Sequence, residues 1–413
     1  MNKYIASLCI LCIAFLAFAD DSQLELRLNP EIEETNEITP ADYSKYKFLN
    51  LRENKINLNG RDWSSLAQKF AEAKAGNRVF SIVYLGDSHI QADFGGDVLR
   101  HRLQEAAGNA GRGVIIPFKM AKTNQPLDYT INTNSPYISS KLLKQPWATE
   151  MPYTGVGIQP TNPNTTFTLS SKTPFNRMRI IKRQGEAKIA AVFGENVGIP
   201  IGYKDDGEWI YFDQDQTDIH ARIETEAETV IGGFDLRCDS IGILVHSIGN
   251  NGATYSSYGM IDKFGSGISE LEADLFIIAL GTNEAYGRIS PEGFISNVDN
   301  LISTIRNHCQ AAEIMIVAPA ESFRRIYRRR NGRRRSSTTV NSKISTLSRS
   351  LRLYAEKEHI PLYHHYRVAG GAGAASKMRQ AHILSSDGIH YTAEGYRLWG
   401  NLLADAILQS IDK

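Results

Sequence analysis

Short apolar runs that alternate with helical patterns constrain the fold of this chain more than any other feature. The runs cover residues 80–85, 241–245, 275–280, 314–318 and 360–363. Between them, apolar residues recur with the three-to-four-residue spacing of amphipathic helices. Strands that alternate with helices favour a parallel sheet with helices on both faces. We therefore predict an α/β domain built from residues 46–118 and 235–413.

Residues 119–234 interrupt this rhythm. They contain short alternating or β-branched segments, separated by turn signals such as Asp205-Asp206-Gly207. Segments of this kind are typical of antiparallel strands. We predict an all-β sandwich domain here, inserted between the first and second strands of the α/β domain.

The N-terminus has the features of an export signal. Lys3 precedes an almost wholly apolar stretch, and residues 17–19 (Ala-Phe-Ala) have the small-x-small pattern of a signal-peptidase site. The stretch is shorter than the roughly 20 residues that span a bilayer. We predict a signal peptide over residues 1–19 and a flexible lead-in over residues 20–45. The mature protein is then expected in the periplasm, in the cell envelope or outside the cell.

Composition narrows the class of protein. The apolar share of 42% and the charged share of 22% are typical of a soluble globular protein. The net charge of +1 gives no overall field that would favour nucleic acid. No metal-ligand spacing or phosphate-binding glycine loop is present, so we predict no metal and no cofactor. Cys238 and Cys309 would remain after export, either as a disulfide or as two thiols.

Four short blocks, far apart in the sequence, contain the residue types of a serine esterase. They are Gly86-Asp87-Ser88-His89, Asn251-Gly252-Ala253, Gly281-Thr282-Asn283-Glu284 and Asp387-Gly388-Ile389-His390. The blocks follow predicted strands or lie in late loops, where open α/β sheets place their sites. Taken singly, the serine also fits a helix cap, and the Asp-x-x-His spacing also fits a turn with a buried histidine. Together, the blocks favour a catalytic site.

Each block supplies one part of nucleophilic catalysis. Ser88 is the predicted nucleophile, and His390 is the base that takes its proton. Asp387 lies three residues before His390 and is the predicted orienting carboxylate. Attack on an ester creates a negative oxygen, for which the predicted donors are the amides of Ser88 and Gly252 and the side chain of Asn283.

The blocks resemble those of the SGNH (GDSL-type) hydrolases, a flavodoxin-like α/β/α superfamily of esterases. Ser88, Gly252, Asn283 and His390 match its four named positions, and Asp387 matches its triad acid. Within the superfamily, the blocks are most similar to those of exported bacterial peptidoglycan O-acetylesterases. Those enzymes also have a β-sandwich, similar to carbohydrate-binding modules, inserted after the nucleophile block. The resemblance implies removal of acetyl from the C6 hydroxyl of N-acetylmuramic acid.

An arginine-rich segment, residues 323–335, is not a feature that the resemblance explains. It follows the fourth strand of the predicted sheet and fits three interpretations: a solvated, mobile loop, a grip on carboxylates of muramic acid or stem peptides, or a nucleic-acid contact. The predicted substrate-binding residues are Arg324, Arg325, Arg328, Arg329 and, in the inserted domain, Trp209. The alternative for Trp209 is a place in the core of the β-sandwich.

These observations predict an exported carboxylic-ester hydrolase that deacetylates peptidoglycan. One alternative is an esterase or acetyltransferase that acts on another O-acetylated polysaccharide. An alternative of a different class is a non-catalytic glycan-binding protein of the cell wall. We expect no nucleic-acid partner and no stable membrane span, and the sequence leaves the oligomeric state open.

Overall fold

The computed structural model describes residues 42–194, 198–238, 241–330 and 333–412. The predicted signal peptide and most of the predicted lead-in lie outside these residues. The last residues of that lead-in belong to the folded domain. They form a 3₁₀ helix, η1 (Tyr43–Lys45), and the Tyr43 hydroxyl donates to the Asp405 carboxylate at 2.5 Å.

A six-stranded sheet forms the centre of the larger domain. Its order is β1 (Ile56–Asn57), β17 (Leu362–Tyr363), β14 (Glu313–Val317), β13 (Leu275–Ala279), β2 (Val79–Gly86) and β12 (Gly242–Gly249). β1 is antiparallel to β17, and the other five strands are parallel to one another. Numbered along the chain from β2, the five parallel strands have the flavodoxin-like order 2-1-3-4-5. The predicted fold class is confirmed.

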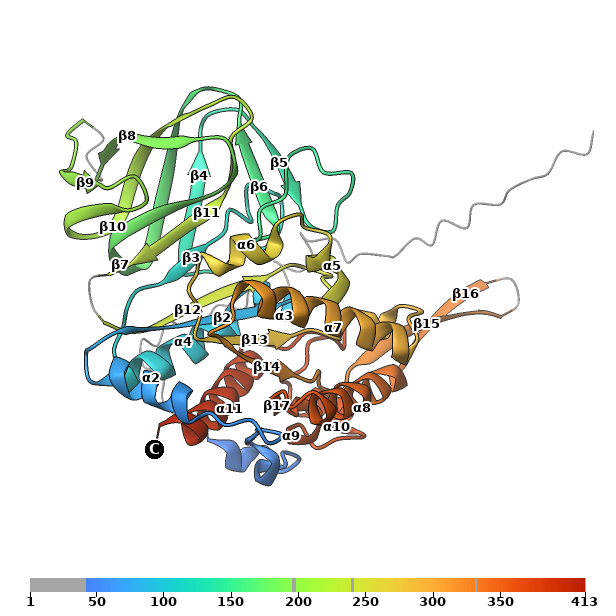
Figure 1. Ribbon diagram of the computed structural model, residues 1–413. Coiled ribbons are helices and arrows are strands. Elements are labelled where there is room, and N and C mark those ends of the chain that lie inside the picture. The colour runs from blue at the N-terminus through green and yellow to red at the C-terminus, as the bar shows by residue number, and fades with distance from the viewer. Residues whose placement is uncertain (1–41, 195–197, 239–240, 331–332, 413) are drawn as a thin grey trace, which may run out of the picture.

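Helices cover both faces of this sheet (Figure 1). One face packs against α2 (Ser64–Lys74), α4 (Phe94–Ala107) and α11 (Ala393–Ile411), and the other against α5 (Tyr255–Gly259), α6 (Phe264–Ser269), α7 (Pro291–His308) and α8 (Ser342–Lys357). Side chains of a strand alternate between these two cores. In β2, Ile82 and Tyr84 belong to the first core, and Val83 and Leu85 belong to the second.

The inserted domain is a separate antiparallel lobe, at the top of Figure 1. Its strands are β3 (Gly113–Ile115), β4 (Tyr129–Thr133), β5 (Tyr137–Lys141), β6 (Val156–Pro160), β7 (Asn164–Gln184), β8 (Ala187–Phe193), β9 (Tyr203–Asp205), β10 (Ile210–Thr225) and β11 (Val230–Arg237). The first half of β7 pairs with β4 and its second half with β11. Because β3 pairs with β11, the β domain extends over residues 113–237, beyond the predicted limits of 119 and 234.

Three local features differ from the sequence-based expectations. The sequence indicates a helix over residues 261–271, and the structure has a shorter one there, α6 (Phe264–Ser269). The arginine-rich segment forms a two-stranded hairpin, β15 (Phe323–Arg330) and β16 (Arg333–Val340), rather than a loop. Cys238 and Cys309 are both free thiols, so the disulfide alternative is not realised. Within the described residues, no helix has the length and apolarity that a membrane span requires.

Candidate active site

The first three blocks meet where the central strands end. In the register of the sheet, Gly86 of β2 lies beside Gly249 of β12 and Ala279 of β13. The short helix α3 (Ser88–Gln91) lies directly over Gly249, where a Cβ atom would come within 2.4 Å of the Gln91 amide nitrogen. This edge includes the switch point between β2 and β13, where ligands bind in doubly wound sheets.

Ser88 is the first residue of α3, and Asp87 caps that helix. The Asp87 carboxylate accepts a hydrogen bond from the His89 amide at 2.9 Å, which turns the chain sharply after β2. The Ser88 side chain is half-buried. Within the described residues its backbone amide has no acceptor, so this amide is available to a ligand.

The structure brings Ser88, His390 and Asp387 into one hydrogen-bonded line. Nε2 of His390 lies 2.8 Å from Oγ of Ser88, and Nδ1 of His390 lies 2.7 Å from Oδ2 of Asp387. With the Nδ1 hydrogen directed at Asp387, Nε2 accepts the hydroxyl hydrogen of Ser88. This is the arrangement in which a histidine acts as a general base toward a serine.

Asp387 is held as an acceptor by its own loop. Its Oδ1 accepts hydrogen bonds from the Ser385 hydroxyl at 2.6 Å and from the Ile389 amide at 2.8 Å. Burial alone would raise the pKa of Asp387, but the hydrogen bond and the charge of His390, followed by these donors, lower the pKa well below its ordinary value. Asp387 is therefore ionised throughout the neutral range. Ser385 was not anticipated from the sequence.

The second block forms a tight turn beside the nucleophile. Gly252 has a φ of 81°, a conformation that favours glycine. The Asn251 amide donates to Oε1 of Gln91 at 2.7 Å, while Nε2 of Gln91 donates to the backbone oxygen of Asn124 at 2.7 Å. The buried Gln91 thus ties the turn to α3 and to the start of the inserted domain. Within the described residues the Gly252 amide donates to no protein acceptor.

Asn283 has a different hydrogen-bond pattern from the one predicted. Its Nδ2 donates to the carbonyl of Ala253 at 2.9 Å and to Oδ2 of Asp87 at 3.1 Å. Both amide hydrogens therefore have acceptors in the protein, and an oxyanion would compete for one of them. The role of Asn283 as an oxyanion donor stays a prediction. What the structure shows is that Asn283 joins the second and third blocks to the nucleophile turn.

Two buried carboxyl groups lie behind the site. Burial raises the pKa of Asp87 to about 6 and that of Glu284 to about 7. Oε1 of Glu284 accepts the Tyr255 amide at 2.7 Å, and within the described residues its Oε2 has no partner. Ionising either group leaves a poorly compensated charge in the protein interior.

A second histidine lies next to the catalytic one. His89 stacks at a tilt against His390, with ring centroids 5.3 Å apart, and its Nδ1 lies 3.2 Å from the Tyr396 hydroxyl. Burial first, and the neighbouring His390 second, lower the pKa of His89 to about 3. His89 is therefore neutral at physiological pH, and His390 is the member of the pair that exchanges a proton with Ser88.

The predicted substrate-binding residues have different surroundings. Trp209 is only 7% exposed, and guanidinium groups of Arg177, Arg179 and Arg237 lie 4.6 to 4.7 Å from its ring centroid. This placement argues against the predicted role of Trp209 in substrate binding and favours its alternative place in the core. Arg324 and Arg325 lie at the base of the hairpin β15–β16.

The candidate site contains some residues of the types that bind metal ions. Within the described residues, no cluster of three or more histidine, cysteine or acidic side chains could hold a metal ion. The site just described contains a nucleophile, a base and two backbone amides that donate to no protein acceptor within the described residues.

Residues 235–398 match the model of the GDSL-like lipase/acylhydrolase family. The α/β domain is thus similar to the GDSL-type, or SGNH, hydrolases. The match contains the second, third and fourth blocks, and the structure adds the first block at the same sheet edge. The predicted resemblance to SGNH hydrolases is thus confirmed. No curated protein sequence matches the chain.

One solved structure is similar to both domains of this chain, and others are similar to a smaller part of it. A structure titled "Peptidoglycan O-acetylesterase in action" is similar over 86% of this chain and 97% of its own, with 21% identity and a TM-score of 0.67. A lipase/acylhydrolase from Enterococcus faecalis is similar over 40% of this chain and 76% of its own, with 19% identity and a TM-score of 0.30. An acetylxylan esterase from Geobacillus stearothermophilus is similar over 42% of this chain and 74% of its own, with 14% identity and a TM-score of 0.29. The first likeness covers both domains and shows that their combination is a known fold.

Proposed function

We propose that this chain is an exported serine esterase that removes O-acetyl groups from peptidoglycan, at C6 of N-acetylmuramic acid. The observation that carries the proposal is the hydrogen-bonded line from Asp387 through His390 to Ser88 at the end of β2. The fold shared over both domains with a structure titled as a peptidoglycan O-acetylesterase supports the choice of substrate.

In the proposed reaction, Oγ of Ser88 attacks the acetyl carbonyl while Nε2 of His390 takes the hydroxyl proton. Asp387 keeps His390 in the required tautomer and stabilises the imidazolium that forms. The sugar oxygen leaves with the proton from His390, and an acetyl group stays on Ser88. Water, deprotonated by His390, then attacks the acetyl-enzyme and releases acetate, which returns Ser88 to its free form.

The amides of Ser88 and Gly252 are the donors proposed for the oxyanion. Both lack protein acceptors within the described residues, and Gln91 holds the turn that carries Gly252. Loss of a donor of this kind typically costs about 10²–10³ in rate. Asn283 is the third proposed donor, after exchange of one of its present acceptors for the oxyanion.

Two measurements test the proposal separately. Hydrolysis of a small acetyl ester by the wild type, with loss of activity in Ser88→Ala, tests the chemistry. Release of acetate from O-acetylated wall, compared with wall that has been chemically de-acetylated, tests the substrate. Unchanged activity of Ser88→Ala on the small ester would contradict the mechanism. Activity on the small ester with no release from the wall would favour another acylated glycan.

A further inference from the structure

The hairpin β15–β16 is formed by a segment rich in arginine. Residues 323–340 contain eight arginines and no acidic residue. The two strands extend away from the α/β domain as a free-standing ribbon (Figure 1). A strand of eight residues spans about 26 Å, so the ribbon extends far beyond the size of one sugar ring. We call residues 323–330 and 333–340 the arginine hairpin.

The register of the arginine hairpin opposes like charges. Arg328 pairs with Arg335, Arg329 with Arg334, and Arg330 with Arg333. Directly opposed like charges destabilise an antiparallel pair. The composition of the hairpin therefore works against its own stability, whereas an anionic polymer along it would neutralise several guanidinium groups at once.

The base of the hairpin is joined to the loop that contains the triad acid and base. The Phe323 amide donates to the Gly388 carbonyl at 2.8 Å, one residue after Asp387. The Tyr286 hydroxyl donates to the Phe323 carbonyl, and the Arg379 guanidinium lies 3.9 Å from the centre of the Phe323 ring. A polymer bound along the hairpin would therefore reach the protein body next to the catalytic loop.

Arg324 is the arginine of the hairpin nearest to that loop. It is half-buried, and within the described residues its Nε donor has no acceptor. Burial raises the pKa of Tyr286, the charge of Asp387 raises this pKa further, and the charge of Arg324 lowers it. Neither Arg324 nor the exposed Arg325 forms an ion pair with a described acidic residue. Both guanidinium groups are thus free to pair with an external anion.

We propose that the arginine hairpin binds carboxylates of the peptide stems on a peptidoglycan strand and holds the strand beside Ser88. This inference rests on the proposed function and adds the part of the substrate that is recognised. Arginine suits this role because its planar guanidinium pairs with carboxylates through two parallel hydrogen bonds. Stem carboxylates are favoured over nucleic-acid phosphates because the hairpin is fixed to an esterase triad, and an anion held there must belong to the polymer that carries the ester.

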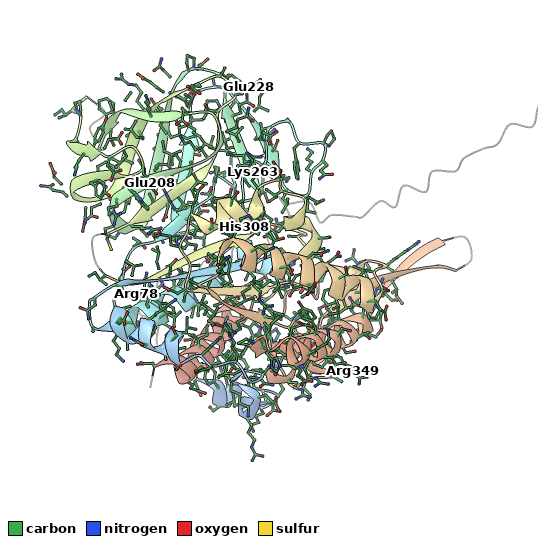
Figure 2. The ribbon with its side chains drawn as sticks, viewed as in Figure 1. Arg78, Glu208, Glu228, Lys263, His308 and Arg349 are labelled. Atoms are coloured by element: carbon green, nitrogen blue, oxygen red, sulfur yellow. The ribbon has the colours of Figure 1, made fainter. Side chains whose placement is uncertain are left out.

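The test compares two variants with the same loss of four positive charges. The first replaces Arg328, Arg329, Arg333 and Arg334 by glutamine. The control replaces Arg52, Lys55, Arg349 and Arg397, which are exposed on the rest of the α/β domain. Figure 2 shows Arg349 on α8, apart from the hairpin. Binding to purified peptidoglycan sacculi is measured by co-sedimentation at 0.05 and 0.5 M salt, and hydrolysis of a small neutral acetyl ester is measured in parallel.

The proposal predicts at least about ten-fold weaker binding to sacculi for the hairpin variant at low salt, because several ion pairs are lost together. It also predicts that binding of this variant to sacculi depends less on salt and that its KM for the wall is raised. Its rate of hydrolysis of the small ester is expected to change by less than about two-fold. The control variant is expected to bind like the wild type. Sacculi with amidated carboxylates are expected to bind the wild type as weakly as native sacculi bind the hairpin variant.

Equal binding of the hairpin variant and the control would overturn the proposal. So would hairpin-dependent binding to a DNA duplex that exceeds binding to sacculi at the same salt, or binding that survives amidation. The assay is independent of the proposed function, because co-sedimentation needs no catalysis. If the wild type hydrolysed neither the small ester nor the acetyl groups of the wall, the proposed esterase function would be contradicted. Its binding to sacculi would still test the role of the arginine hairpin.

Discussion

Replacing Glu284 by glutamine is expected to change how the stability of the protein depends on pH. Glu284 is 4% exposed, and burial raises its pKa to about 7 from an ordinary value of 4.5. Between these two values the folded state keeps a proton that the unfolded state releases. The contribution of Glu284 to stability is therefore fully present below pH 4.5 and is lost as the pH rises to about 7.

The size of this effect follows from the two pKa values. Each pH unit between them corresponds to about 1.4 kcal/mol, so the wild type loses about 3 kcal/mol from this group between pH 4 and pH 8. Glutamine has no proton to release, and its side-chain oxygen can still accept the Tyr255 amide. We compare the free energy of unfolding of Glu284→Gln with that of the wild type. This difference is expected to favour the variant by about 3 kcal/mol more at pH 8 than it does at pH 4.

The measurement is urea unfolding, followed by circular dichroism at pH 4, 5.5, 7 and 8. The quantity compared is the difference in free energy of unfolding between variant and wild type, because other titrating groups cancel in that difference. Glu105→Gln, at an exposed position of α4, is the control and is expected to show a nearly constant difference. A constant difference for Glu284→Gln as well would refute the reasoning that Glu284 is protonated in the folded protein.

Three further predictions concern the site. Asp387→Asn is expected to lower kcat on a small acetyl ester by about 10³–10⁴-fold, because asparagine can select the wrong tautomer of His390. Steady-state kinetics measures this loss, and a loss of less than ten-fold would contradict the role of Asp387. Gln91→Leu removes the acceptor of the Asn251 amide. On the same ester it is expected to lower kcat by about 10²-fold with little change in KM. A change in KM alone would argue against a role of Gln91 in positioning the oxyanion donors. Gly249→Ala places a methyl group against the backbone of α3 and is expected to lower the melting temperature by at least about 5 °C. Calorimetry measures this, and an unchanged melting temperature would contradict the close approach of Gly249 to α3.

The parallel sheet could be predicted from the sequence because buried parallel strands are continuous apolar runs. The run at 80–85 became β2, extended by one residue at each end. The helix expected over 261–271 is shortened to α6 (Phe264–Ser269), which contains the weak helix formers Gly265 and Gly267. The arginine hairpin was not predicted as strands, because arginine-rich segments have no apolar alternation and only pairing with the partner strand defines them.

The composition of the candidate site was readable from the four blocks, since each block contains its chemical residues within four positions. The partners of those residues were not readable, because they come from distant segments. Gln91 meets Asn251 only after β2 and β12 pair, and Asn283 is drawn to Asp87 in the same way. Trp209 is another example, since only the folded β domain places three arginines around its ring.

Acetate release from O-acetylated peptidoglycan tests the central claim most directly. The wild-type chain, Ser88→Ala and chemically de-acetylated wall are compared under the same conditions, and free acetate is quantified. The account predicts release that requires both Ser88 and the acetyl groups of the wall. Release that persists in Ser88→Ala, or no release from acetylated wall by the wild type, would contradict it.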